Sequence, residues 1–155
     1  MIEVEVEAPA WTGALPDAVA TASRAAEAAL AGANRPGGDV VVLLADDDAV
    51  ASLNARFLGK TGPTNVLSFP APAGARPHLG DIALAYGVCA REAAEQGKSL
   101  AHHLMHLVAH GVLHLVGYDH TSDDEAEIME ALERQILEGL GVANPYAPRP
   151  GTHAS

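Results

Sequence analysis

The segment 99–117, with the sequence SLAHHLMHLVAHGVLHLVG, constrains the fold of this chain more than any other. Ser99 is a favoured N-cap residue, and Gly117 allows the chain to leave the helix after the last apolar position. Apolar side chains occupy almost every side of the predicted helix, and a helix that is apolar nearly all round is buried. The other elements are therefore expected to surround this helix.

The remaining chain supplies strands and helices for that purpose. Alternating or continuous runs of apolar residues predict strands at 2–7, 39–45, 64–70 and 79–87. Helical periodicity, acidic first turns and terminal glycines predict further helices at 15–31, 47–59, 88–98 and 121–141. The expected fold class is α+β: a small mixed sheet of about four strands covered by about five helices, with a central buried metal-binding helix.

The length of 155 residues suits one domain, and no repeat or long linker divides the chain. We expect a single domain over residues 1–146 and a flexible, proline-rich tail over 147–155. The single cysteine, Cys89, lies in an apolar stretch, which favours buried packing and a reducing compartment. The N-terminus lacks the features of a signal peptide, and no apolar run approaches the ~18–20 residues of a membrane helix. A cytoplasmic location without membrane contact is expected.

Charge is unevenly distributed along the chain. The net charge of −11 argues against a protein that coats nucleic acid. However, the segment 49–80 contains no acidic residue and includes Arg56, Lys60 and Arg76, whereas the segment 119–138 is strongly acidic with Arg134 as its one basic residue. The net charge of the whole chain therefore hides a locally positive segment, 49–80, beside a strongly acidic one.

Four histidines of the segment 99–117 fall on one face of the helix: His103, His106, His110 and His114. His110 and His114 are one turn apart, a spacing at which two imidazoles bind one metal ion, and Gly117 lets the chain turn back to place His120 as a third ligand. Three nitrogen ligands with an open fourth position are typical of a catalytic zinc site, so one Zn²⁺ per chain is expected. The alternative is a set of core histidines satisfied by their neighbours.

The same ligand spacing occurs in the metzincin proteases, whose first histidine is followed by the glutamate that acts as general base. In this chain Gly111 occupies that position. A peptidase on this frame would lack its base, which makes peptidase activity a minor alternative. Zinc by itself lowers the pKa of a bound water toward ~7, so hydrolysis at such a site does not require a dedicated glutamate.

The motif HGVLHLVGYDH (110–120) resembles the signature of the YbeY family of bacterial rRNA-maturation endoribonucleases. The resemblance extends to GPTNVLSFP, LGDIAL, AREAAEQGKSLAHHLMHLVAHG and DDEAEIMEALE, and covers most of residues 40–146. It implies that His110, His114 and His120 bind zinc. It also implies a single-strand-directed endoribonuclease that acts in 16S rRNA 3′-end maturation and ribosome quality control. The implied partners are single-stranded RNA or rRNA and the small ribosomal subunit or an associated protein.

One position departs from the family pattern. Members usually carry an arginine after the aromatic residue that precedes the PTNVLSFP motif, and here Leu58 occupies that position. We expect Arg56 or Lys60 to supply the catalytic positive charge in place of that arginine. One alternative is that the activity is weaker than is typical of the family. The other is that both cations are solvated surface charges. Ser68 is a candidate substrate-binding residue through its hydroxyl group.

Two further side chains have competing interpretations. Phe69 is either a stacking face for a base or, more simply, part of the core. Asp119 either orients a ligand histidine or caps the turn. A function of a different class also fits the sequence, namely a non-catalytic ribosome-assembly factor whose metal holds the fold together.

Overall fold

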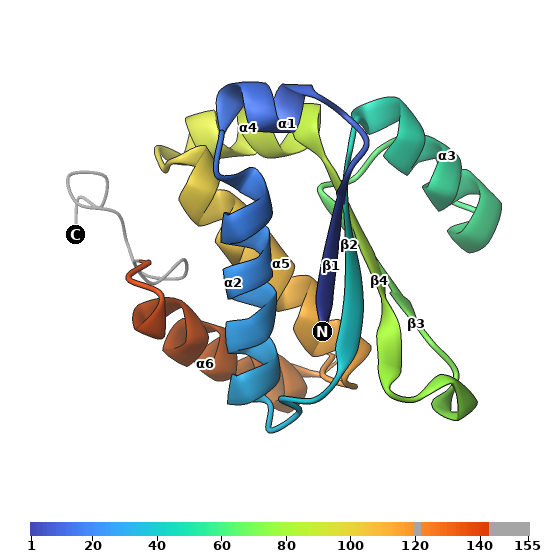
Figure 1. Ribbon diagram of the computed structural model, residues 1–155, viewed down its shortest axis with the longest axis vertical. Helices are drawn as coiled ribbons and strands as arrows, with labels where there is room; N and C mark the ends of the chain where they lie inside the picture. Colours follow the sequence, from blue (N-terminus) through green and yellow to red (C-terminus); the bar gives the residue numbers. More distant parts are fainter. Residues whose placement is uncertain (120–121, 143–155) are drawn as a thin grey trace.

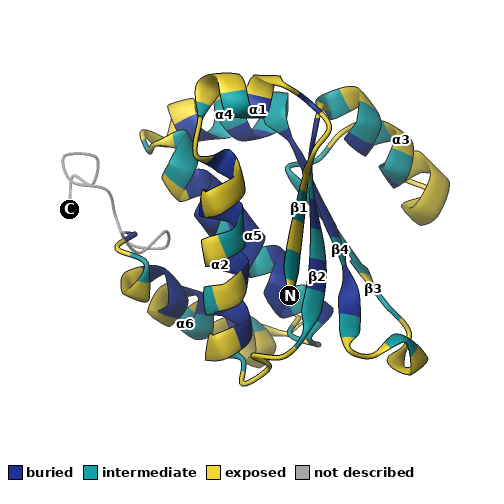
Figure 2. Cartoon of the chain, viewed as in Figure 1, coloured by how far each residue is buried: buried dark blue, intermediate teal, exposed yellow. Residues whose placement is uncertain are grey.

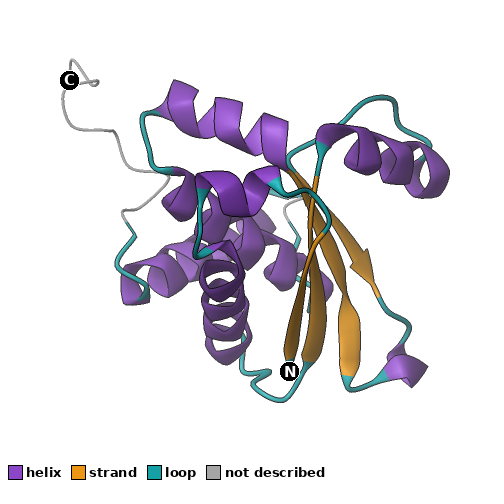
Figure 3. Cartoon of the chain, turned by 45° about the horizontal axis from the view of Figure 1, so that its top comes forward, coloured by secondary structure: helices purple, strands orange, loops and turns teal. Residues whose placement is uncertain are grey.

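A four-stranded mixed sheet forms the framework of the computed structural model, which describes residues 1–119 and 122–142. The strands are β1 (Ile2–Val6), β2 (Asp39–Ala45), β3 (Val66–Pro70) and β4 (His78–Ala85). Their order across the sheet is β1-β2-β4-β3, with β1, β2 and β4 parallel and β3 antiparallel to β4 at the edge (Figure 3). The predicted mixed sheet is confirmed.

Six α-helices accompany the sheet over the described residues: α1 (Ala10–Ala14), α2 (Ala18–Gly32), α3 (Asp47–Leu58), α4 (Tyr86–Gln96), α5 (Leu100–Leu115) and α6 (Asp123–Gly139). α2, α5 and α6 lie on one side of the sheet and α3 on the other (Figure 1). The short α1, which periodicity did not predict, places Trp11 fully inside the core. The α+β fold is as expected, and the predicted tail, residues 147–155, lies outside the described residues.

The main core lies between the sheet and α5. Val40, Val42 and Leu44 alternate along β2 toward this core, and Leu104 and Val112 of α5 are also fully buried or nearly so. Figure 2 shows α5 as a largely buried element enclosed by its neighbours. The burial predicted from its all-round apolar surface is therefore confirmed.

Small side chains on α2 allow close packing around α5. Ala22, Ala25, Ala26 and Ala29 have no exposed surface, whereas Arg24 and Glu27 between them are exposed. An alanine face removes bulk between two helices while it keeps high helix propensity. The alanine-rich composition of this segment is thus a packing feature.

A second, smaller core lies under α3 on the opposite face of the sheet. It consists of Val50 of α3 and the sheet residues Ala45, Leu67, Ala83 and Ala85. The Asp46 carboxylate accepts a hydrogen bond from the backbone N–H of Ala49 at 2.8 Å and caps the start of α3. Gly59 ends the helix in the left-handed conformation, with φ of 65°. This packing brings the end of α3 beside the edge strand β3.

Within the described residues, no helix is long and apolar enough to cross a membrane. Cys89 is fully buried, and burial raises the pKa of its thiol to about 12. The thiol is therefore protonated and packs as a small apolar group, as predicted.

Candidate functional site

The two histidines one turn apart on α5 meet at their outer nitrogens. The Nε2 atoms of His110 and His114 lie 3.1 Å apart, with the rings nearly perpendicular at 78°. Two ligands each ~2.0–2.1 Å from a tetrahedral zinc ion would stand ~3.3 Å apart. The pair therefore fits a shared metal ion without rearrangement of the helix.

The third predicted ligand, His120, lies outside the described residues. Over residues 1–119 and 122–142, no group of three or more His, Cys, Asp or Glu side chains is arranged to hold a metal ion. The structure thus brings together two of the three predicted ligands, and metal binding by all three stays a prediction.

A buried carboxylate on α6 orients His110. Glu133 has no exposed surface, and its Oε1 lies 2.6 Å from His110 Nδ1 while its Oε2 lies 3.3 Å from His106 Nε2. A carboxylate accepts hydrogen bonds, so Nδ1 of His110 donates and Nε2 keeps its lone pair. This is the tautomer that a metal ligand requires.

Sequence reasoning missed Glu133, although a signal was present. Met129, Ile136 and Leu137 form the buried stripe of α6, and Glu133 falls in the middle of that stripe. A charged residue on the apolar face of an amphipathic helix needs a buried partner. Asp119, the predicted alternative for orienting a histidine, is exposed.

A cavity of about 510 Å³ opens in front of the histidines. It is lined by His106, His110 and His114 of α5, by Asn65–Ser68 at β3, and by Leu58, Lys60 and Leu107. The predicted residues Lys60 and Ser68 therefore share a cavity with the two histidines. Arg56 is not among the side chains that line the cavity. Leu58, which occupies the position of the usual family arginine, does line it.

Ser68 and Gly111 explain how closely α5 approaches the sheet. The Ser68 hydroxyl donates a hydrogen bond to the Gly111 carbonyl at 3.2 Å. A Cβ atom added at Gly111 would stand 3.1 Å from Ile82 Cγ2 and 3.2 Å from Ser68 Oγ. A glutamate at this position would force the side chains of Ile82 and Ser68 to shift, so the packing around Gly111 disfavours the general base of a metzincin.

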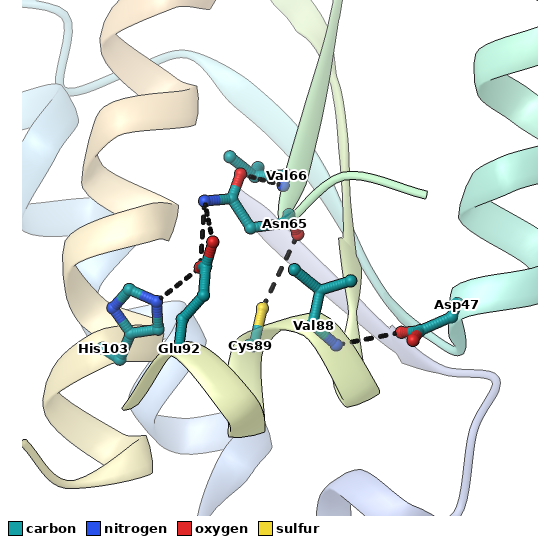
Figure 4. A network of polar contacts seen from close by, with 7 residues as sticks. All are labelled: Asp47, Asn65, Val66, Val88, Cys89, Glu92 and His103. Atoms are coloured by element: carbon teal, nitrogen blue, oxygen red, sulfur yellow. Dashed lines mark hydrogen bonds and ion pairs between the residues drawn. The ribbon is translucent and has the colours of Figure 1, made fainter. Parts of the chain in front are cut away.

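A second polar network lies beside the cavity (Figure 4). The Asn65 side-chain amide donates to Glu92 at 3.1 Å, and Nε2 of the buried His103 lies 2.9 Å from the same carboxylate. Burial lowers the pKa of His103, partly offset by this contact with Glu92. Asn65 also accepts a hydrogen bond from the Val66 N–H, so the network fixes the start of β3 where it lines the cavity.

Comparison with known proteins assigns the chain to a family. A family model described as "Endoribonuclease YbeY" matches residues 5–141. Proteins named Endoribonuclease YbeY from Maricaulis maris and Paramagnetospirillum magneticum are each 50% identical to this chain. The first alignment covers 99% of this chain and 98% of the relative, and the second covers 94% of both.

A solved structure shares the fold. The solution structure of TM1509 from Thermotoga maritima matches with a TM-score of 0.57 and 24% identity, over 99% of this chain and 100% of that one. The family match and the near-complete relatives lead to the same conclusion as the motif around the histidines: this chain belongs to the YbeY endoribonuclease family.

Proposed function

We propose that this chain is a zinc-dependent endoribonuclease that cleaves single-stranded RNA. The observation that carries the proposal is the convergence of His110 and His114 at 3.1 Å in a cavity that Lys60 also lines. The name of the relatives, Endoribonuclease YbeY, supplies the reaction class. The proposed ligands of one Zn²⁺ per chain are His110, His114 and His120.

The residues of the cavity have distinct roles in this proposal. Zinc, when bound, supplies Lewis acidity toward water or a phosphoryl oxygen. Glu133 orients His110, and Lys60 supplies positive charge for the phosphate backbone. Ser68 already donates to the Gly111 carbonyl, and its oxygen keeps acceptor capacity toward a ribose hydroxyl. Arg56, which is outside the cavity lining, contributes to binding of more distant phosphates.

The biological setting follows from the resemblance of the sequence motifs. We propose that the enzyme acts in 16S rRNA 3′-end maturation and ribosome quality control, in the cytoplasm, at the small ribosomal subunit or an associated protein. A chain with a net charge of −11 has few cations for free RNA, so a partner protein is expected to place it on its substrate. Mapping 16S rRNA 3′ ends in a bacterium that carries this protein in place of its own relative tests this setting.

The direct test is cleavage of labelled single-stranded RNA by purified, metal-analysed protein. We expect one zinc per chain, loss of cleavage on chelation, recovery on zinc addition, and little cleavage of a duplex with the same sequence. His110→Ala and His114→Ala should remove both zinc and cleavage, whereas His102→Ala, an exposed change on the same helix, should remove neither. Zinc-loaded protein that leaves single-stranded RNA intact would contradict the proposal and favour the assembly factor with a structural metal. Cleavage of a peptide at a comparable rate would favour the metzincin-like alternative.

A further inference from the structure

The end of α3 carries an aromatic side chain that the fold leaves open to solvent. Phe57 is 60% exposed, although Trp11 is fully buried and Phe69 partly buried. It is the one aromatic residue among the exposed large hydrophobic side chains of residues 1–119 and 122–142. Figure 2 shows that the last turn of α3 is exposed.

Phe57 is exposed because the sheet ends before the last turn of α3. Val50 and Asn54 are the buried positions of α3, and Phe57 continues the same stripe one turn further on. The sheet, however, ends at β3, its edge strand, so this last position of the stripe extends past the second core. Phe57 approaches Phe69 of β3 edge-on, with ring centroids 5.8 Å apart at 68°.

Arg56 places positive charge beside the Phe57 ring, and Asp81 lies opposite Phe69 in the sheet. The Arg56 guanidinium carbon lies 5.3 Å from the centre of the Phe57 ring, and no acidic residue occurs anywhere in the segment 49–80. An exposed aromatic ring next to an arginine is a combination with which proteins bind single-stranded nucleic acid: stacking on the base and charge on the phosphate. An acidic or purely apolar partner would not use both features.

This surface continues to the cavity around the edge of the sheet. Phe69, which Phe57 contacts, faces the second core under α3, whereas Ser68, its neighbour on β3, faces α5 and the cavity. Leu58 and Lys60, one and three residues after Phe57, line the cavity. A single-stranded RNA that crosses the edge of the sheet at β3 would therefore meet Phe57 on one face of the sheet and His110 and His114 on the other.

We infer that Phe57 is a stacking platform for an unpaired base of the RNA substrate, with Arg56 beside it. This inference rests on the proposed function and adds a second contact point, outside the cavity. A base held there makes single-strandedness a condition of productive binding, because a paired and stacked base does not present its face to the ring. It also gives Arg56 a place in the enzyme, since the cavity lining does not include it.

The test compares side chains that differ in their ability to stack. A short fluorescent single-stranded oligoribonucleotide is titrated with the parent, Phe57→Trp and Phe57→Leu proteins, and its integrity is checked on a gel. We expect Phe57→Leu to weaken binding by ~5-fold or more and Phe57→Trp to preserve it, because loss of one base stack costs at least ~1 kcal/mol. Leucine retains an apolar contact with Phe69, and thermal unfolding verifies that the fold is intact. Ile128→Ala, at an equally exposed apolar residue of the acidic α6, is the matched control and should bind like the parent.

Two further measurements separate stacking from charge and from cleavage. The slope of log affinity against log salt should be the same for parent and Phe57→Leu, since no phosphate contact is removed. An oligonucleotide with abasic positions should bind the parent and Phe57→Leu proteins equally. Equal binding of the intact oligonucleotide by these two proteins would overturn the inference, even if the parent cleaves RNA. If the parent protein does not cleave RNA but binds it more tightly than Phe57→Leu does, the inference is supported and the proposed function is contradicted.

Discussion

At the scale of single residues, Glu133 decides how His110 is presented toward His114. Its carboxylate is fully buried, lies 2.6 Å from His110 Nδ1 and also contacts His106. Glu133→Gln keeps the shape of the side chain but weakens its acceptor strength toward the two rings. We expect zinc affinity to fall ~10- to 100-fold, as is typical when the partner of a ligand histidine is changed.

Competition with a chromophoric chelator measures that affinity without reference to activity. Glu130→Gln is the matched control, because Glu130 lies on the same helix and is exposed. The two variants should unfold at similar temperatures. If both bind zinc as tightly as the parent, Glu133 only fills the core.

His103 provides a residue-scale prediction for pH. Because burial lowers the pKa of His103, the unfolded chain binds a proton more readily than the folded one. The stability that this residue contributes is therefore complete above the unfolded pKa of ~6.5 and is lost as pH falls below it, by at most ~1.4 kcal/mol per pH unit. The contact with Glu92 reduces the effect.

Urea unfolding between pH 7 and pH 5, with chelator present so that metal release does not contribute, checks this prediction. His103→Gln should flatten the decline of unfolding free energy with falling pH. His102→Gln, which removes an exposed histidine from the same helix, controls for the change in composition. A decline as steep in the His103→Gln protein as in the parent would rule the prediction out.

At the scale of elements, α3 and the loop that follows it deliver positive charge to the site. Lys60 lines the cavity, and Arg56 lies one turn earlier beside Phe57. The double change Arg56→Gln, Lys60→Gln should lower cleavage of single-stranded RNA and reduce the salt dependence of binding, because each phosphate contact contributes ~0.7 to that slope for single strands. Zinc content and unfolding temperature should stay the same.

The control for this prediction removes the same charge elsewhere. Arg24 and Arg35 are exposed, at α2 and just after it, and the pair Arg24→Gln, Arg35→Gln has the same net charge as the test variant. If the two double variants cleave equally fast, Arg56 and Lys60 are surface charges without a specific role.

At the scale of the whole molecule, the candidate site lies beside the core and is not needed to complete it. The main core joins the sheet to α2, α5 and α6 through fully buried side chains such as Trp11, Leu44 and Leu104. Chelated protein should therefore keep its helical circular dichroism and unfold cooperatively. Zinc should raise the unfolding temperature, and above Kd the rise should follow the logarithm of the zinc concentration. Loss of the helical signal on chelation would show that the metal is structural.

Local patterns in the sequence determined much of this protein. The apolar surface of segment 99–117 required a buried helix, and the one-turn spacing of His110 and His114 placed their nitrogens together, because both properties depend only on helical geometry. The strand patterns likewise predicted a four-stranded sheet. The motifs also indicated the family that the comparisons then showed.

Contacts between distant segments were decided only by the tertiary structure. Glu133 meets His110 across 23 residues of sequence, and Asn65 meets Glu92 across 27, because α6 and α4 pack where they do. The edge position of β3 leaves Phe57 exposed and brings Lys60, but not Arg56, to the cavity. Periodicity tells which face of an element is apolar. Which elements face each other, and where a sheet ends, depends on the packing of the entire core.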